Sequence, residues 1–190
     1  MGRTAAQIIS DADFNYMNST VRIISNRNYA EIKLEGLTVG PFEEGNEYEV
    51  YNWIAVELEK AGVAHKREDD RFDASRLYKI QWKERAQIAG QITKPSDSFY
   101  PELRRCVADL ARAHAQTPEK LREYERVMQL AQDIVNSRLK KIVVLATAST
   151  QTDHILKNLT EEERFLYERL ARLIQGWRDK IIETTEEEQE

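Results

Sequence analysis

The chain has 190 residues, of which 32% are charged and 41% hydrophobic, a composition typical of a folded protein and not of a disordered one. Its longest uninterrupted apolar run, Ile142–Ala146, is far shorter than the roughly 20 residues of a membrane-spanning helix, so we expect no contact with a membrane. The net charge is −5, which argues against a chain that holds DNA by a basic surface of its own. Cys106 is the single cysteine and residues 1–6 lack an apolar leader, so we expect a reducing, cytoplasmic location.

The first third of the chain is predicted to be mainly β structure. We expect an N-terminal extension over 1–18 and a small β domain over 19–66, in which glycines and β-branched residues are concentrated. Its strands are predicted at 21–24, 30–34, 47–50 and 63–66, and one short helix at 52–61. Its core is predicted to contain four residues: Phe42, Val50, Trp53 and Leu58.

The remainder is predicted to be helical. A charged linker over 67–72 precedes a helical domain over 73–184, and an acidic tail follows over 185–190. Apolar spacing and capping residues predict helices at 73–92, from about 98 to 114, at 118–146 and from 161 to about 182. The fold class expected from both parts is α+β, with the β domain first and a helical bundle second.

The helices carry more apolar surface than a bundle of this length needs for its own core. The run at 142–146 is apolar on all sides of its helix, and the last helix is apolar over a wide face. We therefore predict an obligate interface with a partner subunit. The residues expected to form it are Leu139, Ile142, Val143, Leu166, Leu170, Leu173 and Trp177.

Two charged residues lie on apolar helix faces. Glu84 and Arg138 are predicted to be buried, where each needs a partner: the other residue or the backbone. The chain has no glycine-rich phosphate-binding motif, no nucleophile elbow and no histidine or cysteine pair at metal spacing. We therefore expect no enzyme activity, no metal and no cofactor.

A helix face with alternating aromatic and basic residues supports an alternative function. Tyr78 and Trp82 lie one turn apart, beside Lys79, Lys83 and Arg85. Such a face can stack on the bases of single-stranded nucleic acid, although at helical spacing it more often belongs to a core. The alternative prediction is thus a single-stranded nucleic-acid-binding module.

Several motifs resemble those of GINS proteins. Gly40-Pro41-Phe42-Glu43-Glu44-Gly45, followed by Trp53-Ile54-Ala55, resembles the β-domain signature of the Psf-two and Psf-three branch. Arg138–Ile142 and Leu159–Glu163 resemble two segments of GINS helical domains, and Ser98-Phe99-Tyr100 resembles a short element that precedes a helix there. The β-first order and the short chain are most similar to the merged archaeal form of that branch.

The resemblance implies a non-catalytic scaffold subunit that acts in DNA replication. Such a chain would assemble with a helical-domain-first GINS subunit into a 2:2 heterotetramer, and would join the MCM helicase and a RecJ-like replisome partner. Its association with DNA would be indirect, and in an archaeon its cytoplasmic location would be at the nucleoid.

Overall fold

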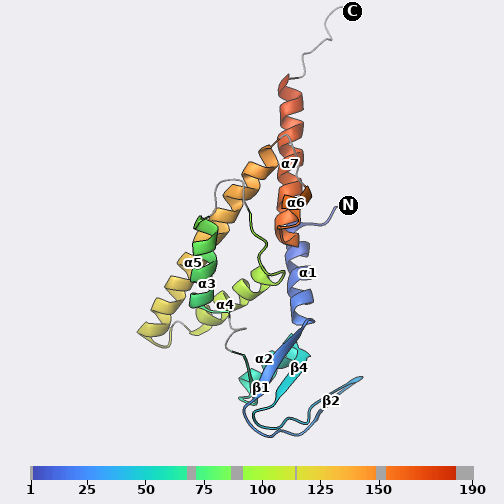
Figure 1. Ribbon diagram of the computed structural model, residues 1–190, viewed down its shortest axis with the longest axis vertical. Helices are drawn as coiled ribbons and strands as arrows, with labels where there is room; N and C mark the ends of the chain where they lie inside the picture. The colour runs from blue at the N-terminus through green and yellow to red at the C-terminus, as the bar shows by residue number, and fades with distance from the viewer. Residues whose placement is uncertain (1, 68–71, 87–91, 114, 149–152, 183–190) are drawn as a thin grey trace, which may run out of the picture. The chain divides into compact units, whose positions relative to one another are not determined.

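The computed structural model describes residues 2–67, 72–86, 92–113, 115–148 and 153–182. The chain forms two compact units, each described by itself below. We call Ser10–Asp73 the strand unit, and Met1–Ile9 together with Ala74–Glu190 the helical unit. The described strands all fall in the first unit and the long helices in the second (Figure 1). The predicted α+β class, with the strands first, is confirmed.

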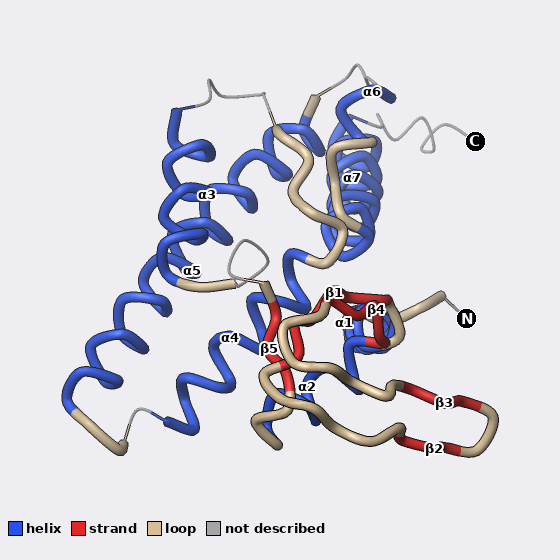
Figure 2. Tube along the Cα trace, turned by 60° about the horizontal axis from the view of Figure 1, so that its bottom comes forward, coloured by secondary structure: helices blue, strands red, loops and turns tan. Residues whose placement is uncertain are grey.

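The strand unit contains two small antiparallel sheets. In the larger one, the central strand β1 (Thr20–Ser25) pairs with β4 (Glu47–Tyr51) and with β5 (Ala64–Lys66). A separate hairpin pairs β2 (Ile32–Leu34) with β3 (Leu37–Val39) (Figure 2). The sequence analysis did not predict β3, a three-residue strand that lies between two glycines of positive φ, Gly36 and Gly40.

One apolar core holds the strand unit together. Helix α2 (Asn52–Lys60) packs on β1, β4 and β5. The buried members of the core come from the strands, from α2 and from the segments beside them: Ile23, Val39, Phe42, Val50, Ile54, Ala55, Leu58, Val63 and Ala64. Three of the four predicted core residues therefore lie in this core.

The fourth, Trp53, does not. It is 37% exposed, whereas Ile54, Ala55 and Leu58 form the buried face of α2. The prediction was right for Leu58 but not for Trp53: the two are five residues apart, about 140° around a helix, so they do not share a face.

Two glycines explain the turns of this unit. Gly62 adopts φ +65° after α2, where the Val63 N–H donates to the Leu58 carbonyl at 2.9 Å and the Gly62 N–H to the Glu59 carbonyl at 3.0 Å. Gly40 has φ +93°, and a Cβ there would lie 3.1 Å from the Phe42 ring. The glycine of the Gly40-Pro41-Phe42 motif thus makes room for a core aromatic ring.

The helical unit is organised around its longest helix. α5 (Pro118–Thr147) packs against α3 (Ala74–Ala86), α4 (Phe99–Ala113) and α7 (Glu161–Ile182), while α6 (Asp153–Leu156) is a single turn. The Oγ1 of Thr117 caps α5 by accepting from the Lys120 N–H at 3.3 Å, as its position before Pro118 predicts. None of the described helices is both long and apolar enough to cross a membrane.

Two boundaries differ from prediction. The described part of α3 stops at Ala86, residues 87–91 lie outside the described residues, and Ile92, near which the helix was predicted to end, is buried without being helical. The N-terminal extension contains a helix that was not predicted, α1 (Ala5–Met17), whose single buried residue is Ile8. Its sequence signal is a capping box, in which the Thr4 N–H donates to Gln7 Oε1 at 2.8 Å and the Gln7 N–H to Thr4 Oγ1 at 3.2 Å.

Residues 68–71 of the charged linker predicted at 67–72, and all of the acidic tail predicted at 185–190, lie outside the described residues.

Candidate interaction surface

Helix α7 carries an exposed apolar stripe. Leu166, Leu173, Trp177 and Ile181 follow one another at spacings of seven, four and four residues, so they line one side of the helix. Leu173 is 70% exposed and Trp177 62%, values far above those of core residues of this size. Three of the predicted interface residues, Leu166, Leu173 and Trp177, therefore lie on the surface of the unit.

Leu170 lies between this stripe and the core. It is half-buried and packs against the cluster formed by Ile92, Ile142, Ala146, Leu159 and Tyr167. At 100° per residue, Leu170 falls between the exposed Leu166 and the buried Tyr167 on the wheel. The apolar face of α7 is thus wider than the part that its own unit covers.

Helix α5 carries a second exposed stripe along its C-terminal half. Leu139 and Val143, both predicted interface residues, are exposed, and so is Val135 one turn before them. The prediction for Ile142 is wrong: it is 1% exposed and belongs to the core cluster with Tyr167. The run at 142–146 is split, with Ile142 and Ala146 turned inward and Val143 and Val144 outward.

On the C-terminal half of α5 and on α7, the prediction of the interface missed four exposed apolar residues. Val135 continues the α5 stripe and Ile181 the α7 stripe, each at a spacing of four, and this periodicity was available in the sequence. Val144 and Ile182 lie outside these stripes, and only the fold shows that they are uncovered. We refer below to Val135, Leu139, Val143, Leu166, Leu173, Trp177 and Ile181 as the apolar stripes.

The centre of the helical unit is charged. Glu84 on α3 and Arg138 on α5 are both buried and pair with each other, Arg138 Nη1 to Glu84 Oε1 at 2.6 Å. Lys141, one turn after Arg138, donates to the second oxygen of Glu84 at 2.6 Å and to its carbonyl at 3.0 Å. This cluster therefore joins α3 to α5.

Glu163 extends the cluster to α7. Its carboxylate accepts from Arg138 Nε, and from Arg138 Nη2 at 2.7 Å. Tyr100 of α4 donates its hydroxyl to Glu163 Oε1 at 2.7 Å. Together these residues join all four long helices of the unit, and we call Glu84, Tyr100, Arg138, Lys141 and Glu163 the buried network.

Burial and neighbouring charges shift the pKa of two members of the network, Tyr100 and Arg138. Burial raises the pKa of the Tyr100 hydroxyl well above its usual value, and the negative charge of Glu163 raises it further. Burial alone would lower the pKa of Arg138, but Glu163 and then Glu84 outweigh it and raise the pKa. Two carboxylates thus face two cations, and their oxygens are occupied by these partners. This arrangement suits a structural role better than proton transfer to a substrate.

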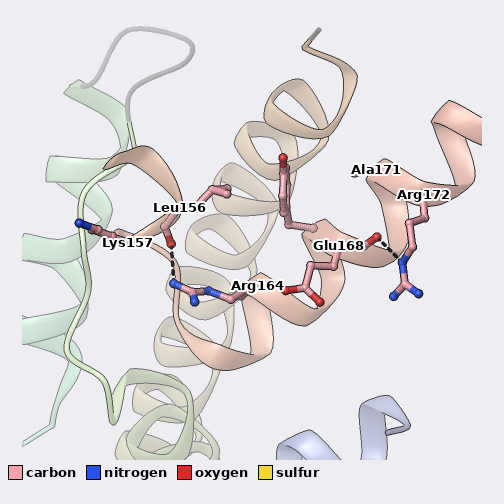
Figure 3. Close-up of a pocket in the computed structure, with 7 residues that line it drawn as sticks. Leu156, Lys157, Arg164, Glu168, Ala171 and Arg172 are labelled. Carbon is pink, nitrogen blue, oxygen red and sulfur yellow. Dashed lines mark hydrogen bonds between the residues drawn. The ribbon is translucent and has the colours of Figure 1, made fainter. Parts of the chain in front are cut away.

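A groove lies between α6 and α7. It encloses about 660 Å³ and is lined by Leu156, Lys157, Arg164, Tyr167, Glu168, Ala171 and Arg172. Figure 3 shows that Arg164 reaches the carbonyl of Leu156, at 3.2 Å, and that Arg172 turns back to the carbonyl of Glu168, at 3.1 Å. Its rim is mainly cationic, and its floor belongs to the core cluster.

Tyr78 and Trp82 lie on the surface of their unit and not in a core. Trp82 is 65% exposed, and the buried side of α3 is formed instead by Leu77, Gln81 and Glu84. Arg85 on the same helix pairs with Asp133 of α5 at 2.8 Å. The aromatic and basic face proposed for nucleic acid thus exists as an exposed surface.

No group of three or more potential metal ligands occurs among the residues that the structure describes. Cys106 is partly exposed on α4.

Comparison with known families decides what kind of protein this is. Residues 71–182, more than half of the chain, match the family model of the GINS complex protein helical bundle domain, Sld5. The chain belongs to the GINS family. A search of curated proteins found no match.

GINS membership makes this chain a subunit of a complex that acts in DNA replication and that contains other GINS subunits. The family is one of non-catalytic complex subunits, in agreement with a charged centre whose oxygens are already occupied. The match gives no support to the nucleic-acid-binding alternative. It covers all of the helices that carry the apolar stripes and the buried network.

Proposed function

We propose that this GINS chain is a non-catalytic scaffold subunit whose helical unit docks on another GINS subunit through the apolar stripes of α5 and α7. The observation that carries the proposal is the exposure of Leu173 and Trp177 on a helix inside the family-matched region. Large apolar side chains grouped on one face are typical of a surface that a partner covers.

The order of the units supports membership of the Psf-two/Psf-three branch. Strands and their core occupy the chain before residue 73, and the family match begins at residue 71. A β domain over 19–66 ahead of a helical domain over 73–184 is the order that the resemblance implies for this branch. The archaeal merged form, which assembles 2:2 with a helical-domain-first subunit, is the member that we propose.

The wider partners follow from the same proposal. As part of such a tetramer, the chain would activate the MCM helicase and bind a RecJ-like partner, at the nucleoid in the cytoplasm, with DNA contacted indirectly. The strand unit offers its exposed aromatic residues Tyr29, Tyr51 and Trp53 for contacts outside the tetramer.

The experiment is co-expression with a helical-domain-first GINS subunit, followed by measurement of the mass in solution. The expected result is one species with two copies of each chain. Leu173→Asp should reduce this species at least tenfold, because it places a carboxylate in the middle of the covered surface.

A matched control comes from the same helix. Gln175 is exposed and lies roughly opposite Leu173 on the helical wheel, so Gln175→Asp adds the same charge outside the α7 stripe. This variant should assemble like the unmodified chain. A normal tetramer with Leu173→Asp, or equal losses in both variants, would contradict the proposed surface.

A further inference from the structure

Helix α7 is buried most deeply at its start. Of its 22 residues, the two that are buried are Glu163 and Tyr167, both in the first two turns. Further along, Ile174 packs on the core cluster and Arg178 donates to the Thr147 carbonyl at 2.9 Å, while the stripe residues Leu173 and Trp177 are exposed. The first two turns are therefore the most enclosed of the contacts that set the position of the stripe.

Glu163 performs two tasks in those turns. It completes a capping box, in which the Thr160 N–H donates to Glu163 Oε2 at 3.1 Å and the Glu163 N–H donates to Thr160 Oγ1 at 3.3 Å. The same Oε2 accepts from Arg138 Nη2 at 2.7 Å. One carboxylate oxygen thus serves both the start of α7 and the ion pair with α5.

Arg138 is in turn fixed by the rest of the unit. Its Nη1 donates to Glu84 at 2.6 Å and to the Thr93 carbonyl at 3.1 Å. Glu84 is neutralised independently by Lys141 at 2.6 Å. These partners hold the Arg138 guanidinium without any contribution from α7. Its Nε and Nη2 groups donate to Glu163.

We propose that the Glu163 carboxylate couples the start of α7 to the charged centre of the helical unit, which makes Arg138 a positioning residue for the stripe on α7. The coupling concerns the chain alone; its consequence for docking rests on the proposed function. In an isolated helix, a capping box closes without outside help. Here its glutamate is buried, so an ionised Glu163 is costly unless Arg138 faces it.

Loss of the ion pair between Glu163 and Arg138 should therefore weaken the capping box, and loss of the capping box should weaken the ion pair. Without Arg138, Glu163 either takes up a proton or turns toward water, and in the second case it leaves the Thr160 N–H without its acceptor. Without the Thr160 hydroxyl, Glu163 is held less firmly in front of the guanidinium. Two residues that meet at one carboxylate should then show non-additive effects.

The test is a double-mutant cycle on the full chain, read by hydrogen exchange at the amides of residues 164–170. We expect Thr160→Ala and Arg138→Lys each to accelerate exchange there by about tenfold, since each loosens the first turns of α7. If the two effects were independent, the acceleration in the double variant would equal the product of the two single accelerations. We expect the observed acceleration to be at least threefold smaller than this product. Effects that multiply within twofold would overturn the coupling.

Two controls isolate the shared carboxylate. Glu84→Gln changes the far side of the Arg138 guanidinium, so its combination with Thr160→Ala should be multiplicative. In a Glu163→Gln background, the amide can still close the capping box but cannot form the ion pair, so the coupling between Thr160 and Arg138 should vanish. Coupling that persists in this background would also overturn the proposal.

The two proposals can fail separately. Exchange is measured without a partner, so a chain that shows the coupling but never assembles would refute the docking surface alone. If the coupling is present and assembly occurs, Arg138→Lys should weaken assembly, while exposed stripe variants such as Leu173→Asp leave the coupling intact.

Discussion

The two units of this GINS chain differ in where their charged residues lie. The strand unit has an apolar core, and most of its charged residues are exposed. The helical unit buries Glu84, Arg138, Lys141 and Glu163 at its centre and leaves large apolar residues uncovered. Net charge differs as well: the strand unit contains 7 basic and 14 acidic residues, a net −7, whereas the helical unit contains 21 basic and 19 acidic ones, a net +2.

The difference teaches how each unit obtains a single structure. Apolar cores tolerate shifts of packing as long as volume is kept, whereas a hydrogen-bonded ionic cluster is satisfied in one arrangement only. The strand unit is stabilised mainly by burial. In the helical unit, we infer that the buried network fixes how the helices pack against one another.

The largest expected effect comes from removing the guanidinium at the centre of the network. Arg138→Ala leaves Glu163 buried without its cation, which should lower the free energy of unfolding of the helical unit by about 3–5 kcal/mol. Urea unfolding followed by far-ultraviolet circular dichroism measures it. A loss under about 1 kcal/mol would contradict the central place given to Arg138.

The next effect tests the apolar core of the strand unit. Phe42→Ala removes a buried ring and should destabilise this unit by about 3 kcal/mol, whereas Trp53→Ala should cost about 1 kcal/mol because Trp53 is partly exposed. For Phe42→Ala, urea unfolding of the strand unit is followed by the fluorescence of Trp53, in a chain whose Trp82 and Trp177 are replaced by phenylalanine. For Trp53→Ala, the unfolding of this unit is followed by hydrogen exchange in β1. Equal losses of unfolding free energy in the two variants would indicate that Trp53 belongs to the core.

A smaller effect depends on pH. Tyr100→Phe removes a hydrogen bond to a carboxylate and should cost about 2 kcal/mol at neutral pH. The pKa of Tyr100 is raised in the folded chain, so its contribution is complete below the unfolded value near 10 and declines as the pH rises above it. Urea unfolding of both proteins from pH 8 to 11 should show the gap between them narrowing from about pH 10 upward.

The smallest expected effect on stability belongs to the exposed stripe. Leu173→Asp should change the free energy of unfolding of the isolated chain by less than about 0.5 kcal/mol, since Leu173 has few neighbours to lose. Thermal unfolding of the chain alone measures it. A larger loss would mean that the Leu173 side chain itself packs on the helical unit.

Local signals predicted much of the fold. The capping box at Thr160, the proline after Thr117 and the glycine after α2 mark helix ends through bonds within one turn, so they are visible in the sequence. The pattern also showed that Glu84 and Arg138 are buried. It could not show Glu163 as their partner, because its position three residues after Thr160 already had a local explanation.

The burial of individual apolar residues was harder to predict, because it depends on contacts between residues distant in sequence. Ile142 and Val143 are equally apolar neighbours, and the packing of Leu159 and Tyr167 on one side alone decides which is buried. The same holds for Trp53 against Ile54, and for the ring of Trp82. A helical wheel gives the width of an apolar face, but the partner elements decide which part of it is covered.

Because the buried network is enclosed by protein, its ion pairs should respond to ionic strength differently from those on the surface. Mobile ions screen charges that face water, but they act much less on pairs enclosed by protein. The ion pairs of the strand unit, such as Lys60 with Glu57 and Arg22 with Glu47, face solvent, whereas those of Arg138 and Lys141 do not. Added salt should therefore weaken electrostatic contacts on the strand unit and leave the setting of the α5 and α7 stripes unchanged.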